Sequence, residues 1–195
     1  MDLMPFDEIN KFKEFVAEYK SVPAHTPEQK RRFRDDLWEY IEFLLIEAYE
    51  YGNVQARADL GLLDDEKTYL NPEKMREAVN RSVAGKTAFQ RMTEYADDDE
   101  STVEDFTRVA ETDTTRVYNE SVLDTAAETG IPGIKKQWHT MEDDRVRDPH
   151  AYLDGMIVPY SQKFFSYDGD SALAPGGFSN PALNINCRCN ISLIR

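Results

Sequence analysis

A change in the sequence pattern near residue 130 constrains the fold more than any other feature. Before this point, apolar residues recur at three- and four-residue spacings and follow helix start signals. After Ile131-Pro132-Gly133, aromatic and β-branched residues alternate with polar ones, and Gly and Pro recur every few positions. We therefore predict an α+β protein, with a helical module over residues 1–130 and a small mixed module of short β-strands and long loops over residues 131–195.

The helical module is predicted to hold about four helices, one of them long. The first follows Pro5, and the long second helix starts at the capping box Thr26-Pro27-Glu28-Gln29, which has proline at the first helical position. It should run to about Ala58, before Leu60-Gly61 stops it. Its inward stripe is predicted to be Phe33, Leu37, Ile41, Leu44, Ala48 and Tyr51.

Two further helices are predicted before residue 130. Asn71-Pro72-Glu73 should start the third, which would continue to the acidic run Asp97–Glu100 and be weakened or kinked at Gly85. We interpret that acidic run as a solvated cap and turn, because it lacks the alternation and glycine of a calcium loop. The residues Ser101-Thr102-Val103-Glu104 resemble a second capping box, so the fourth helix would run to about Thr129, where Gly130 can cap it.

The mixed module is predicted to contain three main strands. The first covers Ile134 to Thr140, and the second covers Met156 to Val158 after the Asp154-Gly155 turn. The last strand should place Cys187, Cys189, Ile191 and Leu193 on one face. The segment from Ser166 to Pro181 is rich in Gly, Ser, Pro and Asp and is predicted to be a long loop. Aromatic residues between Tyr160 and Phe178 would either form a contact surface or cover a small core.

The net charge of −14 belongs entirely to the helical module. From Ile131 onward there are 7 basic and 7 acidic residues, so the first 130 residues hold 16 basic and 30 acidic ones. Such a surface repels DNA, and it suits either simple solubility or a basic protein partner. No apolar run is long enough to span a membrane and the first residues do not resemble a secretion signal, so we expect no membrane partner and a cytoplasmic site of synthesis.

An ordered set of motifs begins at about Phe106. The run Asp105–Asn119 is followed by Lys136–Thr140, Asp143–His150, Leu153–Gly155, Pro175–Gly177 and Asn186–Cys189. This order resembles the phage Mu F-like head-morphogenesis family, whose pattern reads I-A-R-T-E-x-x-R-x-x-N, then W-x-T, D-x-R-V-R-x-x-H, D-G, P and C-R-C. Glu111 and Asp113 depart from it. The matching positions that we single out are Thr112, Arg116, Asn119, Trp138, Asp143, Arg145, Arg147, His150, Gly155, Cys187, Arg188 and Cys189.

The resemblance implies a minor head protein of a tailed phage. Such a protein binds the portal or the procapsid interior during assembly, and in some relatives it is packaged and accompanies DNA at ejection. The implied partners are the portal protein, the major capsid protein and other internal head proteins. The implied location is the host cytoplasm during assembly and then the virion, in the head interior or portal region. We expect the acidic helices to carry the docking surface.

The charged cluster of Asp143, Arg145, Arg147 and His150 allows two interpretations. It could be an anion pocket, because arginine suits phosphate, but we favour a hydrogen-bond and ion-pair network that fixes the loops of a small domain. The alternative function would be a phage-encoded enzyme or toxin-like effector acting on nucleotides or nucleic acid. Such an enzyme would need a basic surface, which the composition does not provide, so we expect no enzymatic activity and no cofactor.

The two cysteines raise the question of a metal. With His139 and His150, Cys187 and Cys189 supply the ligand types of a tetrahedral zinc site. On an extended strand, however, a C-x-C pair holds its sulfur atoms about 7 Å apart, which does not suit one ion unless the strand bends. We therefore favour two reduced cysteines acting as small apolar core residues, with zinc as the alternative.

Overall fold

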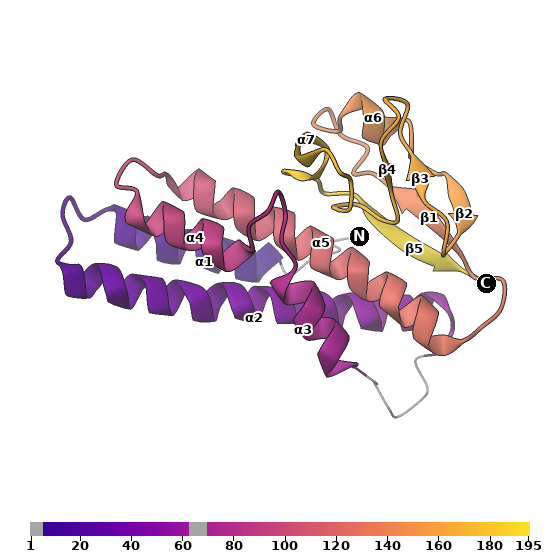
Figure 1. Cartoon of the computed structure of the whole chain (residues 1–195), viewed down its shortest axis with the longest axis horizontal. Coiled ribbons are helices and arrows are strands. Elements are labelled where there is room, and N and C mark those ends of the chain that lie inside the picture. The colour runs from indigo at the N-terminus through magenta and orange to yellow at the C-terminus, as the bar shows by residue number, and fades with distance from the viewer. Residues whose placement is uncertain (1–5, 63–69) are drawn as a thin grey trace.

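The protein consists of an elongated layer of helices with a small β-module on one side. A computed structural model describes residues 6–62 and 70–195. The helices α1 (Phe6–Lys20), α2 (Pro27–Asp59), α4 (Ala88–Asp97) and α5 (Val103–Thr129) run alongside one another, and α3 (Pro72–Asn80) packs against α2 and α5 (Figure 1). The α+β class is confirmed, with helices in the first part of the chain and short antiparallel strands in the second.

The start of α2 is as predicted, because Thr26 and Gln29 form a complete capping box. The start of α5 is displaced by one residue from the prediction. Thr102, not Ser101, caps the helix. The carboxylate of Asp105 completes the box by accepting hydrogen bonds from the backbone N–H and the hydroxyl of Thr102. Gly130 ends α5 in the left-handed conformation, as expected.

The predicted third helix is two helices, α3 and α4, and this prediction of a continuous helix was wrong. Val83 and Lys86 exchange backbone hydrogen bonds of 2.8 and 3.2 Å and form an isolated β-bridge. The turn between them holds Ala84 and Gly85 at φ of 53° and 83°, which is the backbone of a tight hairpin turn. Because glycine adopts this conformation readily, the chain reverses where the pattern had indicated only a kink. The first part therefore has five described helices.

Two long helices, α2 and α5, approach each other closely. At Gly52, an added Cβ would lie 2.4 Å from the carbonyl oxygen of Tyr118 and 2.9 Å from Cβ of Ser121. Tyr51, expected inside, is 36% exposed, although its ring lies 5.9 Å from that of Tyr118, whereas Tyr49 and Gly52 are buried against α5. The core of the helical layer therefore depends on a glycine that the periodicity of large apolar residues does not reveal.

The β-module is built around β1 (Lys135–His139), which lies between β2 (Ile157–Pro159) and β5 (Asn190–Ile194) in an antiparallel sheet. A second, two-stranded sheet pairs β3 (Phe164–Phe165) with β4 (Ser171–Ala172), and the short helices α6 (Asp148–Ala151) and α7 (Pro181–Asn184) lie in the connections. Thus most of the predicted long loop is irregular, but it contains β4 and the start of α7.

Burial in the sheet follows the predicted alternation, with Ile134, Lys136 and Trp138 all buried. The prediction for the last strand needs a correction: β5 starts at Asn190, so both cysteines precede it. Asn186 has a φ of 55°, and this bend changes the direction of the chain just before Cys187. The cysteines therefore lie on the segment that leads into β5, outside the paired strand for which the spacing rule was used.

Candidate functional site

The motif residues of α5 hold the C-terminal segment against the helix. The Oδ1 atom of Asn119 accepts a hydrogen bond of 2.9 Å from the backbone N–H of Ile191, and its Nδ2 donates to the carbonyl of Cys189 at 3.2 Å. About two turns earlier on this helix face, Thr112 Oγ1 accepts a hydrogen bond from the backbone N–H of Asn186 at 3.0 Å. These bonds fix residues 186–191 from one side, and both side chains are buried. Their role is to position backbone, not to offer reactive groups to solvent.

Arg116 lies between Thr112 and Asn119 and is also buried. Its guanidinium contacts Asp113 at 3.1 Å and Glu120 at 3.1 Å, and it donates to the carbonyl of Ala78 in α3 at 2.8 Å. Burial raises the pKa of Glu120, although the neighbouring guanidinium groups oppose this shift. Gly176 packs on the aliphatic part of Arg116, where an added Cβ would lie 2.8 Å from its Cβ.

The motif arginine therefore connects three parts of the chain: α3, α5 and the loop of the β-module. Asp113, which departs from the family pattern, is fully buried and also accepts from Arg91 of α4 at 2.6 Å. A buried carboxylate requires such pairing.

The predicted charged cluster is divided between two places. Asp143 forms a two-pronged ion pair with Arg188, with distances of 2.8 and 2.7 Å, and lies 3.7 Å from Nε of Arg145. Hydrogen bonds from Arg188 hold the pKa of Asp143 at about 2, well below its usual value. Arg147 donates to the carbonyl of Ile185. These contacts support the network interpretation for the charged side chains, whereas His150 points into the core.

His150 lies with both cysteines in a buried group. Its Nδ1 atom is 3.6 Å from Sγ of Cys187 and 3.4 Å from Sγ of Cys189. The hydrogen bond from Cys189, helped by His150, lowers the pKa of the Cys187 thiol, although burial opposes the shift. His139 does not join this group: its Nε2 atom lies 2.7 Å from Oγ of Ser192. The structure thus unites three of the four candidate ligands.

Aromatic side chains surround this group. The ring of Trp138 contacts those of His150, Phe164 and Phe178, with centroids 5.8, 5.2 and 5.9 Å away. In contrast, Phe165 and Tyr167 are 64% and 60% exposed. Some aromatic residues between Tyr160 and Phe178 therefore cover the small core as predicted, while others are exposed, and their use as a contact surface stays a prediction.

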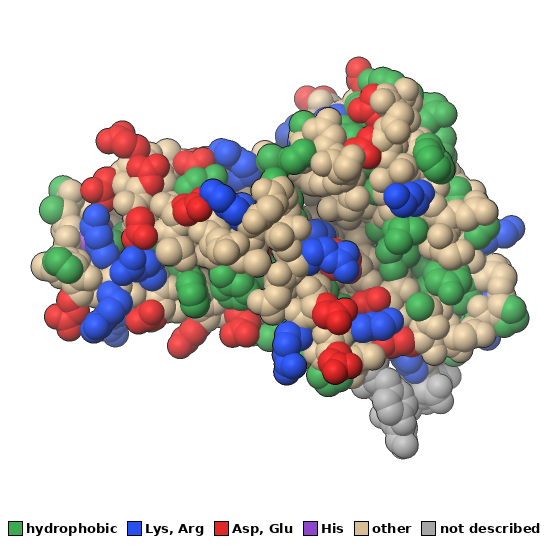
Figure 2. Space-filling view, viewed as in Figure 1, with side chains coloured by type: hydrophobic (Ala, Val, Ile, Leu, Met, Phe, Trp, Pro, Cys, Tyr) green, Lys and Arg blue, Asp and Glu red, His purple; other side chains and the backbone are tan. Residues whose placement is uncertain are grey.

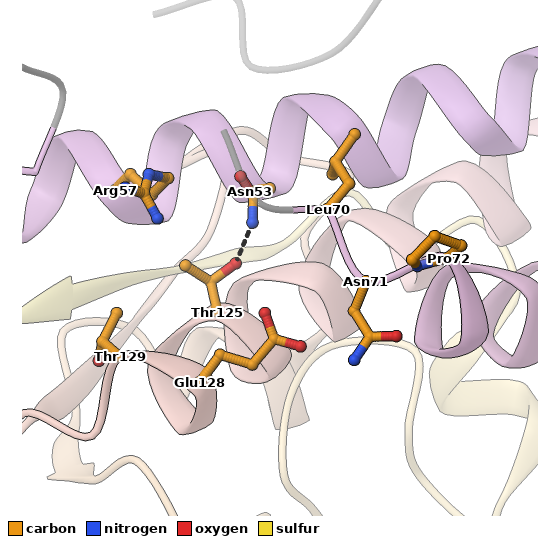
Figure 3. Close-up of a pocket in the computed structure, with 8 residues that line it drawn as sticks. All are labelled: Asn53, Arg57, Leu70, Asn71, Pro72, Thr125, Glu128 and Thr129. Carbon is orange, nitrogen blue, oxygen red and sulfur yellow. Dashed lines mark hydrogen bonds between the residues drawn. The ribbon is translucent and has the colours of Figure 1, made fainter. Parts of the chain in front are cut away.

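A hollow of about 550 Å³ lies between α2, α5 and the start of α3 (Figure 3). Nδ2 of Asn53 donates to Oγ1 of Thr125 at 2.9 Å in its wall. Its other lining residues are Arg57, Leu70, Asn71, Pro72, Glu128 and Thr129. Leu70 in its lining follows directly in sequence on residues 63–69, which lie outside the described part of the chain, so we assign the hollow no function.

The ordered motifs and the two modules that they join indicate a phage head-morphogenesis protein. The family model described as Phage Mu protein F like protein matches residues 73–192, more than half of the chain. The chain therefore belongs to the phage Mu F-like family, which is a class of phage morphogenesis proteins and not a class of enzymes. The match begins at Glu73, well before the first motif. Comparison with curated proteins gives no match, and neither does comparison with solved structures.

Proposed function

We propose that this protein is a minor head protein that binds the portal or the procapsid interior while the head of a tailed phage assembles. The family match over residues 73–192 carries this proposal. The motif geometry supports it. Thr112, Arg116 and Asn119 are buried, and each forms a hydrogen bond to the backbone of another segment, which suits a rigid binding protein. The portal protein is the first partner to test, followed by the major capsid protein and other internal head proteins.

The outward face of α2 is the docking surface that we propose. Asp35, Glu39 and Glu42 are exposed and spaced four and three residues apart, so they lie along one side of the helix. Beside them, Trp38 and Phe43 are 49% and 45% exposed. An acidic stripe next to two aromatic rings suits a partner surface with basic residues around an apolar centre.

The charge distribution favours the helices over the β-module as the docking side. All of the net negative charge belongs to residues 1–130. Acidic side chains are spread along the helical layer in Figure 2, where basic side chains lie among them. Several of these charges pair within the protein, as in Lys30–Asp99 and Arg34–Asp97, so the exposed stripe of α2 is the better candidate for a partner.

Mass spectrometry of purified virions and empty procapsids tests the role. We expect the protein in procapsids at a few to a dozen copies when scaled to the portal protein. Its detection in virions as well would show that it is packaged. Absence from both particles would refute the minor head role.

Two matched double variants test the docking surface. Exposed ion pairs contribute about 0.2–1 kcal/mol each, so Glu39→Gln with Glu42→Gln should weaken portal binding about 2- to 30-fold. The control is Glu142→Gln with Asp144→Asn, which removes two exposed charges from the β-module. Binding to purified portal is measured at two salt concentrations. An equal effect of both double variants would refute the assignment to α2, while leaving the minor head role to the particle experiment.

A further inference from the structure

The group formed by His150, Cys187 and Cys189 has the geometry of a metal site. Its three ligand atoms all lie within 4.8 Å of one another, and all three residues are buried. We propose that Nδ1 of His150 and the two Sγ atoms bind one zinc ion. This inference is independent of the proposed head function, because it concerns how the β-module is held together.

The distances agree with a shared ion. With zinc–sulfur bonds of about 2.3 Å and zinc–nitrogen bonds of about 2.0–2.1 Å, tetrahedral angles separate sulfur from nitrogen by about 3.5–3.6 Å. The two sulfur–nitrogen distances are 3.6 and 3.4 Å. Both cysteines precede β5, so strand pairing does not fix them, and their side chains converge on Nδ1 of His150. A straight strand would hold the sulfur atoms about 7 Å apart.

Hydrogen bonding alone does not account for the group equally well. A neutral imidazole offers one acceptor nitrogen, so Nδ1 can accept a hydrogen bond from only one of the two thiols that face it, and the second thiol is left to donate to the sulfur of the first, which is a weak acceptor. The other ring nitrogen, Nε2, is buried and has no hydrogen-bond partner among the described residues. Zinc would engage Nδ1 and both sulfur atoms together, with the ring proton on Nε2. The two thiol protons would be released to solvent as the thiolates bind.

A fourth ligand can reach the ion from one side. A small hollow of about 10 Å³, which is room for about one water molecule, adjoins the group, and Met141, Arg145, Arg147 and Arg188 contribute to its wall. Three protein ligands and a water molecule from this hollow would complete a tetrahedron. Two thiolates neutralise the charge of the dication, so the nearby guanidinium groups do not disfavour it.

Zinc at this position would join α6 to the segment before β5. His150 lies in α6, while Cys187 and Cys189 flank Arg188, whose guanidinium already pairs with Asp143. From the opposite side, Asn119 of α5 holds the carbonyl of Cys189. The β-module has only short strands and helices, so a metal link between two of its connections would stabilise this segment, because zinc binds the folded site and not the unfolded chain.

The first test uses the unaltered chain, so that no substitution disturbs folding. The protein is purified without chelators and under reducing conditions, and its metal content is measured by mass spectrometry. We expect one zinc ion per chain, which a chelator removes and added zinc restores. Replacement by cobalt(II) should give thiolate-to-cobalt charge-transfer absorption. A chain that holds no zinc, gives no such absorption with cobalt, or contains a Cys187–Cys189 disulfide in place of bound metal would overturn the proposal.

Matched variants then identify the ligands. Cys187→Ser and His150→Gln should each weaken zinc binding more than about 100-fold, because even partners outside the ligand shell contribute about 10- to 100-fold. The control is His139→Gln, since His139 lies in the same module but contacts Ser192. Circular dichroism shows whether each variant is folded, and chelator competition gives its affinity. If folded His150→Gln kept the affinity of the unaltered chain, or if His139→Gln lost it, the ligand set would be wrong.

Discussion

The contact between Gly52 of α2 and the backbone of α5 predicts an unusual effect of a small substitution. In most helix interiors, Gly→Ala stabilises a protein by about 0.5–1 kcal/mol, because glycine loses more conformational freedom on folding. In Gly52→Ala the new methyl group would lie 2.4 Å from the carbonyl oxygen of Tyr118. That oxygen belongs to the backbone of a long helix and cannot turn aside. The two helices must therefore move apart.

The magnitude follows from what this movement disturbs. Overpacking a core costs about 1–3 kcal/mol. Separation would also weaken the hydrogen bonds from Ser121 to the carbonyl of Tyr49 and from Asn53 to Thr125, each contributing about 0.5–1.5 kcal/mol. After subtracting the intrinsic gain of alanine, we expect Gly52→Ala to lower the free energy of unfolding by about 2–4 kcal/mol.

Urea unfolding followed by circular dichroism measures this change as a shift of the midpoint. The matched control is Val54→Ala on the same helix, because Val54 is 44% exposed and its truncation should change stability by no more than about 0.5 kcal/mol. An unchanged or increased stability of Gly52→Ala would show that α2 and α5 do not approach closely at this point, and the reasoning would fail.

Three further outcomes are expected. Asn119→Ala should lower the free energy of unfolding by about 2–4 kcal/mol, since it leaves buried backbone groups of Cys189 and Ile191 without partners, and hydrogen exchange at the amide of Ile191 should accelerate. The pKa of Asp143, measured by NMR, should be about 2 and should rise in Arg188→Gln. Because this folded-state pKa lies below the usual value, the contribution of the Asp143 carboxylate to stability is present at neutral pH and is lost as pH falls from about 4 toward 2. Burial lowers the pKa of Lys136 from 10.5 to about 8, so the folded state releases this proton at a lower pH than the unfolded state does. The free energy of unfolding should therefore rise as pH increases from about 8 to about 10.5, and Lys136→Met should abolish the rise.

Local capping signals predicted the boundaries of most helices. The Thr26 capping box and Gly130 determine helix ends through contacts with residues only a few positions away, so these ends do not depend on the rest of the fold. The break between α3 and α4 was underestimated, because a turn at Ala84-Gly85 competes with a helix that the apolar spacing also permits. The role of Gly52 could not be predicted from its neighbours in sequence, because a close helix contact can be recognised only when the partner helix is known.

The candidate site was partly accessible from sequence. The order of the motifs identified the family and named the residues that meet at α5. It did not show that Asn119 would bond the backbone of the last strand, because that contact joins residues 72 positions apart. The cysteine spacing was misleading because the rule for a straight strand was applied to a segment that precedes β5 and is not paired in the sheet. Only the three-dimensional arrangement separates His150 from His139.

The position of β5 has a consequence for the order in which the protein can fold during synthesis. The sheet needs β5 beside β1, and the backbone N–H of Leu193 donates to Asp59 of α2 at 2.8 Å. The ribosome delivers α2 and β1 long before residues 190–194, so one edge of β1 stays unpaired until that strand emerges. Contacts over such sequence distances form slowly. The newly made chain therefore exposes an open strand edge beside a helical layer that can already be folded, and during this interval other chains can compete for it.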